Sequence, residues 1–327
     1  MLHMIAWYKW LVLLSVSIVT LDLVFAASDT RQTYLPGADL VASDFRGQNL
    51  DGAIFTGANL VGAIFDGASL RGADMRESYL RKASFNSADL TGALLDASDL
   101  TLADLSNANL ESSSLVRAIL DSARLDGANL RSAFLPGASL VKANLRNTDL
   151  EGAVLTDANL SQADLQGANL QGANIGTLGL GNPGPLGAKL IGADLSNANC
   201  SGAMIASVDF SEAVLIGTDF RDANLGYANL TWVRARGANF QGASLPWVRA
   251  YSADFRNADF VGAILTLAQL TGANLSGANL SEANLEYSDL SQTVLSNTLA
   301  DNAMVTGIEL GAAKDVPESL RPPLQTQ

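Results

Sequence analysis

A five-residue period runs through nearly the whole chain and constrains its fold more than any other feature. Residues 271–290 read TGANL SGANL SEANL EYSDL, and a bulky apolar residue falls on almost every fifth position from Leu35 to Leu310. In an α-helix, five residues advance about 500°, so these side chains would scatter around the helix. In a strand they would alternate between opposite faces. The chain must therefore turn regularly, so that each pentapeptide returns its apolar centre to one interior.

Units such as Ala58-Asn59-Leu60, Ala163-Asp164-Leu165 and Ala278-Asn279-Leu280 resemble the A(D/N)LXX units of the pentapeptide-repeat proteins. The resemblance extends over residues 35–310 in one register. It implies that family's fold, an all-β, right-handed quadrilateral β-helix (a β-solenoid) with four pentapeptides to a coil and about 13–14 coils in this chain. At about 4.8 Å between stacked strands, the rod would be roughly 65 Å long.

Residues 1–26 have the features of a secretory signal peptide. Lys9 precedes an apolar run over residues 11–24, and small residues surround the end of this segment. Cleavage is predicted after Ala26. The alternative is an uncleaved membrane anchor, although the run is shorter than the roughly 20 residues that span a bilayer. Residues 27–34 would cap the first coil, because an open solenoid end exposes a strand edge.

The repeat is divided into two blocks, residues 35–175 and 188–310. Between them residues 176–187, GTLGLGNPGPLG, are rich in Gly and Pro and predict a projecting loop. Spacing alone does not decide whether this loop adds to a coil or replaces part of one. A binding loop and an insertion without a role are both open. Residues 311–327 hold three prolines and are interpreted as a flexible tail or a short cap.

A coil of 20 residues predicts that side chains 20 positions apart stack on each other. Phe45, Phe65 and Phe85 should therefore form a column in the core. Tyr227, Trp247, Leu267 and Tyr287 have the same spacing and should form a second column outside the core.

This outer column is combined with arginines. A duplicated Trp-Val-Arg-Ala string at residues 232–235 and 247–250 adds Trp232, Arg234 and Arg249. Aromatic residues mixed with Arg are typical of interface hot spots. The candidate partner surface therefore comprises Tyr227, Trp232, Arg234, Trp247, Arg249, Leu267 and Tyr287. The alternative interpretation is side-chain stacking that only stiffens a corner of the solenoid.

Residues able to carry catalysis are scarce. The only histidine, His3, lies in the predicted signal peptide, and the only cysteine, Cys200, occupies a centre position and should be a buried core residue. The mature chain therefore has no Cys/His or Ser/His/Asp pair and no nitrogen or sulfur cluster for zinc. It also lacks a Gly-rich phosphate loop. We predict no enzyme activity, no cofactor and no metal site, although an oxygen-only calcium site stays open.

The net charge of −13 makes direct nucleic-acid binding unfavourable, because such binding needs a basic face that displaces counterions. Much of the acidity comes from the repeat itself. Of 33 acidic residues, 14 are Asp in the position just before the centre, where the repeat contains Asp or Asn.

Two functions follow. The first is an exported, non-enzymatic scaffold or protein-interaction module whose faces dock an unknown protein partner. A homodimer stays open, and membrane contact is expected only through an uncleaved signal segment. The second is implied by the resemblance, since some family members mimic DNA and bind type II topoisomerases. A signal peptide argues against it, because that target is cytoplasmic. The family is abundant in cyanobacteria and has members in the thylakoid lumen or periplasm, which is the location that the resemblance implies.

Overall fold

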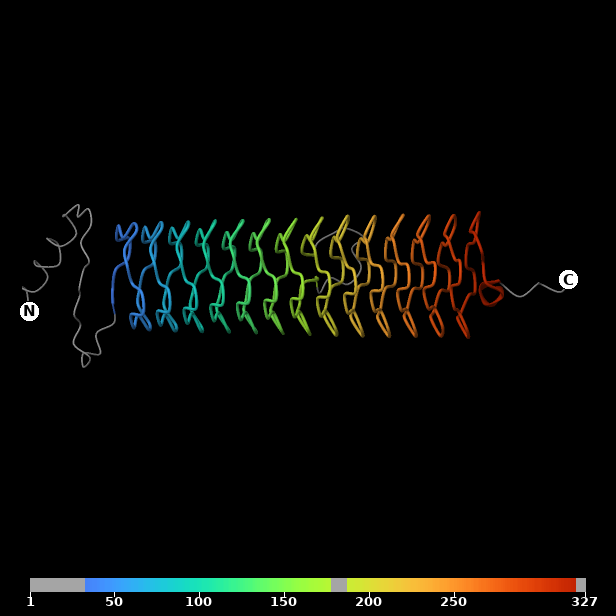
Figure 1. Ribbon diagram of the computed structural model, residues 1–327, viewed down its shortest axis with the longest axis horizontal. Coiled ribbons are helices and arrows are strands. Elements are labelled where there is room, and N and C mark those ends of the chain that lie inside the picture. The colour runs from blue at the N-terminus through green and yellow to red at the C-terminus, as the bar shows by residue number, and fades with distance from the viewer. Residues whose placement is uncertain (1–32, 178–186, 322–327) are drawn as a thin grey trace, which may run out of the picture.

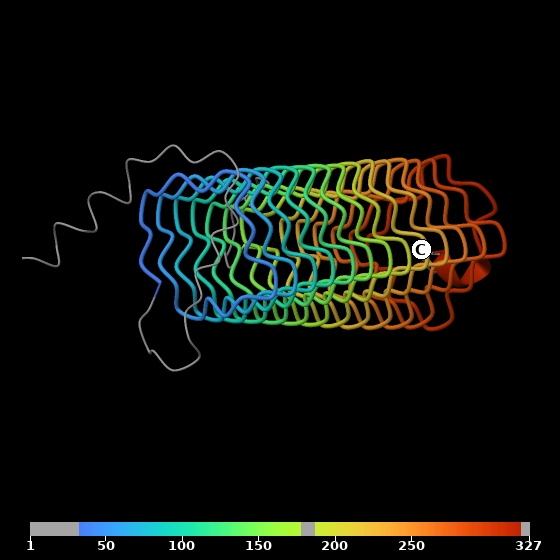
Figure 2. The ribbon, with the colours of Figure 1, turned by 60° about the vertical axis from the view of Figure 1, so that its left-hand side comes forward.

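Coils stacked along one axis form an elongated rod (Figure 1). The computed structural model describes residues 33–177 and 187–321; the expected signal peptide at residues 1–26, most of the expected N-terminal cap and the end of the expected tail lie outside these ranges. An oblique view shows the successive coils wound around one common axis (Figure 2). The architecture is a right-handed quadrilateral β-helix of about 13–14 coils, as the resemblance implied.

Parallel β-bridges between neighbouring coils define four faces. Each bridge joins one residue to a single residue of the next coil, which lies 20 positions later except across the 176–187 segment. Bridged residues recur every five positions along the chain. Face A begins at Tyr34, face B at Asp39, face C at Asp44 and face D at Asn49. Corners are named by the two faces they join, such as corner AB. The described residues contain one helix, the short 3-10 helix η1 at Glu318–Leu320.

A tight turn separates each face from the next. After Leu60, the N–H of Ala63 donates to the Leu60 carbonyl at 3.0 Å, and Gly62 between them has a φ of 68°. A positive φ at this third residue is characteristic of a type II turn. The same position, here called the left-handed turn position, has a positive φ in every described pentapeptide from Gly37 to Ala312 outside the 176–187 segment. Gly adopts this conformation without steric cost, which explains its frequency there.

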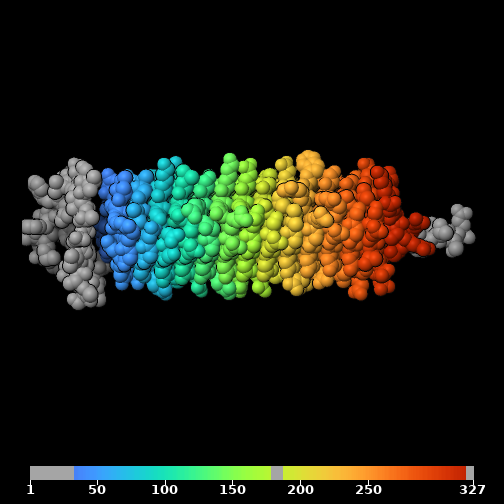
Figure 3. Space-filling model, viewed as in Figure 1, coloured from blue at the N-terminus to red at the C-terminus, as the bar shows by residue number. Residues whose placement is uncertain are grey.

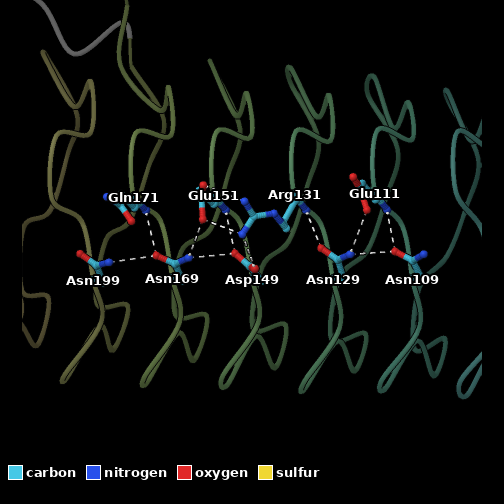
Figure 4. A network of polar contacts seen from close by, with 9 residues as sticks. All are labelled: Asn109, Glu111, Asn129, Arg131, Asp149, Glu151, Asn169, Gln171 and Asn199. Atoms are coloured by element: carbon cyan, nitrogen blue, oxygen red, sulfur yellow. Dashed lines mark hydrogen bonds and ion pairs between the residues drawn. The ribbon is translucent and has the colours of Figure 1, made fainter.

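The Asp or Asn before each centre, here called the Asx position, caps the following turn. Its Oδ1 accepts the N–H two residues later: Asn129 accepts from Arg131 at 3.0 Å and Asp149 accepts from Glu151 at 3.1 Å. On face D these side chains also bond between coils, as where Asn129 Nδ2 donates to Asn109 Oδ1 at 2.9 Å (Figure 4). Short polar side chains are favoured at such turns. Part of the acidity is therefore a consequence of the turns.

Centre residues and the alanines two positions before them fill the interior. Nearly all of these side chains are buried between Leu50 and Ala300. The predicted aromatic column is confirmed: the ring centroids of Phe45 and Phe65 lie 4.9 Å apart, and those of Phe65 and Phe85 lie 4.8 Å apart. Cys200 is fully buried, as predicted. Like residues stacked in this way keep the core close-packed from coil to coil.

The segment at residues 176–187 adds to a coil and does not replace part of it. Across the segment, bridges join residues 30 apart, such as Asn174 and Met204, whereas before and after it they join residues 20 apart. The N–H of Ala188 donates to the Ile175 carbonyl at 3.1 Å, as the corresponding groups do across an ordinary corner. One coil thus carries an insertion at corner AB.

The C-terminal end of the rod is covered by residues 311–321. Leu320 in η1 is fully buried, and Val316 packs against the core. At the opposite end, Leu35, Leu40 and Phe45 are only partly buried within the described residues. In the space-filling view, the side chains make a continuous rod surface from the first coil to this cap (Figure 3).

Turn strain can be tested with a matched pair of substitutions. In Gly62→Ala the added methyl group meets nothing within 4 Å, but φ is 68°. Because a left-handed conformation costs an L-residue about 1–2 kcal/mol, the free energy of unfolding from chemical denaturation should fall by about 1 kcal/mol. Ala97 has a φ of 55°, so Ala97→Gly should raise the free energy of unfolding. Shifts of the same sign would show that turn strain does not select Gly.

Candidate interaction surface

Four residues of the predicted surface form one column on corner AB. Backbone bonds connect its rungs, as where the N–H of Trp247 donates to the Thr266 carbonyl at 3.0 Å. The rings of Tyr227 and Trp247 stack with centroids 6.2 Å apart and 4° between their planes. Tyr227, Trp247 and Tyr287 are exposed, and Leu267 is half-buried. The stack of Tyr227 on Trp247 has the predicted geometry, Leu267 is less exposed than predicted, and the role of the column in binding stays a prediction.

The other three predicted residues lie elsewhere on the rod. Arg249 is on face B, where it is bridged to Asn229. Trp232 lies on corner BC, the opposite edge of face B, and Arg234 follows on face C. The structure therefore spreads the predicted surface over two faces and places Arg249 between two aromatic edges. Arg234 is separated from the column by the width of face B.

All five apolar residues of this surface occupy left-handed turn positions. Tyr227, Trp232, Trp247, Leu267 and Tyr287 have φ values between 58° and 60°. Bulky L-residues rarely adopt this conformation, which costs about 1–3 kcal/mol where it is enforced. The backbone thus favours Gly at each of these positions, yet the sequence places four exposed aromatic side chains there.

The insertion emerges from the same corner as the aromatic column. The N–H of Thr177 donates to the Ala206 carbonyl at 3.2 Å, and the N–H of Gly187 donates to the Ser207 carbonyl at 3.3 Å. The N–H of Ser207 in turn donates to the Gly226 carbonyl at 2.9 Å, directly before Tyr227. The described ends of the loop are therefore separated from Tyr227 by a single turn along corner AB.

Face A carries apolar side chains that sequence reasoning missed. Its outward Asx positions hold Tyr34, Ile54, Leu94, Phe134, Val154, Met204, Ile264 and Met304. Five of these eight side chains are exposed. The signal was a 20-residue recurrence of apolar residues at the Asx position, but the insertion shifts it by ten residues between Val154 and Met204. Face A and corner AB together make the most apolar side of the rod.

Most described arginines are neutralised by carboxylates. In one arrangement an Arg bonds to the Asp two residues before it. In another, Arg131 donates to Glu151 in the next coil at 2.6 and 2.7 Å (Figure 4). The hydrogen bond from Arg46 holds the pKa of Asp44 at about 2, and the bond from Arg76 lowers the pKa of Asp74 below its ordinary value of 3.8.

No other chemistry is evident in the described residues. They contain no group of three or more His, Cys, Asp and Glu side chains placed to hold a metal ion. Burial raises the pKa of the Cys200 thiol far above its usual range, which keeps the group protonated. Within the same ranges, no helix has the length and apolar character needed to cross a membrane.

The ion pair between Asp74 and Arg76 predicts that the stability of the fold depends on pH. Because the pKa of Asp74 is lower in the folded state than its ordinary 3.8, the pair stabilises the fold above that pH and the contribution is lost as the pH falls below it. Arg76→Gln should move the pKa of Asp74 back towards 3.8, as measured by NMR titration of its carboxyl carbon. The denaturation midpoint of the variant should then lose less between pH 7 and pH 3 than that of the parent. An unchanged Asp74 titration would contradict the assignment.

Several solved structures are similar to this chain, whereas no curated protein matches the sequence. HetL, a pentapeptide repeat protein involved in heterocyst differentiation regulation in the cyanobacterium Nostoc sp. strain PCC 7120, is 27% identical over 82% of this chain and 89% of that chain, with a TM-score of 0.30. A trypsin-treated variant of QnrB1, a plasmid-mediated fluoroquinolone resistance protein, is 19% identical over 62% and 88%, with a TM-score of 0.33.

A thylakoid lumen pentapeptide repeat protein of Arabidopsis thaliana is 34% identical over 35% of this chain and 67% of that chain, with a TM-score of 0.20. A family model described as pentapeptide repeats matches in eight copies, over residues 31–67, 65–96, 98–137, 138–175, 187–222, 213–249, 251–286 and 278–313. Since these matches cover far more than half of the sequence, the chain belongs to the pentapeptide repeat family.

Proposed function

We propose that this protein is a non-enzymatic interaction scaffold that docks a partner protein along corner AB. The observation that carries the proposal is the exposed aromatic column at left-handed turn positions, where the backbone favours Gly. The fold requires the left-handed conformation at these positions but not a bulky residue in it, and local backbone strain of this kind clusters at functional sites. Pentapeptide repeat proteins are generally structural or interaction proteins, and a rigid solenoid suits this role because it holds outward side chains at fixed spacing.

Ring stacking within the rod offsets only part of the backbone strain of the aromatic residues. A stacked pair is worth about 0.5–1.5 kcal/mol, so the contact between Tyr227 and Trp247 offsets at most about the strain of one of these two residues. Tyr287 and Trp232 are each 61% exposed and stack on no other ring in the described residues. Burial of these rings against a partner would supply the missing stabilisation.

The alternative, an acidic rod that mimics DNA and binds a type II topoisomerase, is favoured by the net charge of −13. The distribution of charge weakens it. Ion pairs join Arg46, Arg71, Arg76, Arg81, Arg124, Arg131, Arg146, Arg221 and Arg256 to neighbouring carboxylates, so the anionic surface is interrupted along the rod.

Export to the thylakoid lumen or periplasm is part of the proposal and is tested separately. Its support is the signal-like composition of residues 1–26, since a charged start, a short apolar run and small residues at the end favour cleavage after Ala26. We expect N-terminal sequencing of the protein purified from its own cells to begin at Ala27, in a lumenal or periplasmic fraction. An intact Met1 in the cytoplasmic fraction would remove export and make topoisomerase binding the function to test next.

Replacement of Tyr227, Trp247 and Tyr287 by Ser should abolish capture of the partner protein, because the column loses its rings. The β-type circular dichroism should stay unchanged, since all three side chains are exposed. The tagged protein is used to capture partners from its own compartment, and the captured partner is then titrated in purified form. Tyr79→Ser, which removes an exposed ring from face B in the first block, is the matched control. Retention of the partner by the triple variant would refute the proposed site.

A further inference from the structure

Residues 223–253 form a basic band on an otherwise acidic rod. The band contains Arg234, Arg236 and Arg249 and has no Asp or Glu, whereas the chain as a whole carries a net charge of −13. Where an Asx position of the band holds Asp or Asn, it always holds the uncharged Asn: Asn224, Asn229 and Asn239. Carboxylates are therefore absent from about one and a half successive coils.

The three arginines of the basic band form no ion pair and no side-chain hydrogen bond in the described parts of the chain. The bridge neighbours of Arg249 on face B are Asn229 and Gln269, which carry no charge. The guanidinium donors of Arg249 are thus left for a ligand.

The other two arginines interact with carboxylates only at longer range. Arg234 contributes electrostatically to the lowered pKa of Asp194, and Arg236 contributes to that of Asp254. Neither carboxylate accepts a hydrogen bond from them, and the Asp254 carboxylate already accepts from Arg256 at 2.8 and 2.6 Å. The donors of Arg234 and Arg236 are therefore also free to bind an anion.

Two of these arginines cost the fold some turn stabilisation. Arg234 and Arg249 occupy Asx positions, so the turns after them lack the side-chain cap that Asp or Asn supplies. No hydrogen bond of their guanidinium groups within the described rod offsets this loss, which points to an external anion.

Aromatic side chains border Arg249 on both edges of face B. The stacked Tyr227 and Trp247 form the edge at corner AB. Trp232 and Tyr251 form the edge at corner BC, where the backbone N–H of Trp232 donates to the Tyr251 carbonyl at 3.0 Å. The planar guanidinium group of Arg249 can donate two parallel hydrogen bonds to one carboxylate. The exposed rings on either side add apolar surface to this charged centre.

We infer that the basic band is a docking site for an acidic segment of a partner protein, whose carboxylates bind Arg249 and Arg234 while its apolar groups pack on the aromatic edges. This inference rests on the proposed function and names the chemistry of the partner. A nucleic acid fits poorly, because a phosphate backbone running along face B would meet Asp209 before the basic band and Asp289 after it. A short acidic peptide segment fits between these carboxylates.

The tryptophans of the basic band provide a direct readout. Trp232 and Trp247 are the only tryptophans outside residues 1–26, so the full chain with Trp7→Phe and Trp10→Phe reports on this site alone. Titration with a decaglutamate peptide should give a saturable fluorescence change that weakens with added salt, and decaglutamine should give none. Arg249→Gln should raise the Kd about ten-fold or more.

Arg117→Gln is the matched control, because Arg117 also lacks an ion pair in the described residues but lies far from the aromatic edges; its Kd should change less than about two-fold. Absent decaglutamate binding, or an Arg249→Gln variant that binds normally, would overturn the inference. Tighter binding of duplex DNA or polygalacturonate would overturn the assignment to an acidic protein segment. A natural partner that is lost by the Tyr227, Trp247 and Tyr287 variant but kept by Arg249→Gln would leave the proposed function standing and refute this inference alone.

Discussion

Outside the corner that carries the insertion, every coil of this solenoid depends on a residue in the left-handed conformation at each of its corners. Gly occupies 22 of these positions, and other residues adopt the same conformation at an expected cost of about 1–2 kcal/mol each. The cost is offset within the same pentapeptide, since each turn buries a centre residue and an Ala and usually gains a side-chain cap. Because each coil contacts only its neighbours, stability accumulates along the rod coil by coil.

Since the turns determine most of the sequence, departures from the repeat are where functional information lies. Two residues of each pentapeptide point inward, one caps the turn and one should be Gly. An aromatic ring at the left-handed position, as in Trp247, or an Arg at the Asx position, as in Arg249, weakens the local fold. Both kinds of departure meet on face B between Tyr227 and Tyr251, and this coincidence distinguishes the second block from the first.

Spacing and the family resemblance together predicted the features that repeat within one block. The period of five indicated a solenoid, and the 20-residue coil that the resemblance implied placed the Phe65 column and the stack of Tyr227 on Trp247. Features that cross the insertion were not predicted, because bridges there join residues 30 apart and hide the continuity of face A from Val154 to Met204. The lack of an ion pair at Arg249 could not be predicted either, because the carboxylates that pair with arginines in this rod lie 2, 18 or 20 residues away in different cases.

Repetition also limits how such a protein can recognise anything. The interior is filled by Leu, Phe and Ala in every coil, so binding must use outward side chains on flat faces and corners. Flat surfaces bind well when their anchors lose little freedom on association. Tyr and Trp have only two side-chain torsions, and here they stand on a backbone that the turns hold in one conformation. The turn strain at Tyr227 and Trp247 therefore coincides with pre-organisation, so the same corner that costs stability in the free rod would lower the entropy cost of docking the partner proposed above.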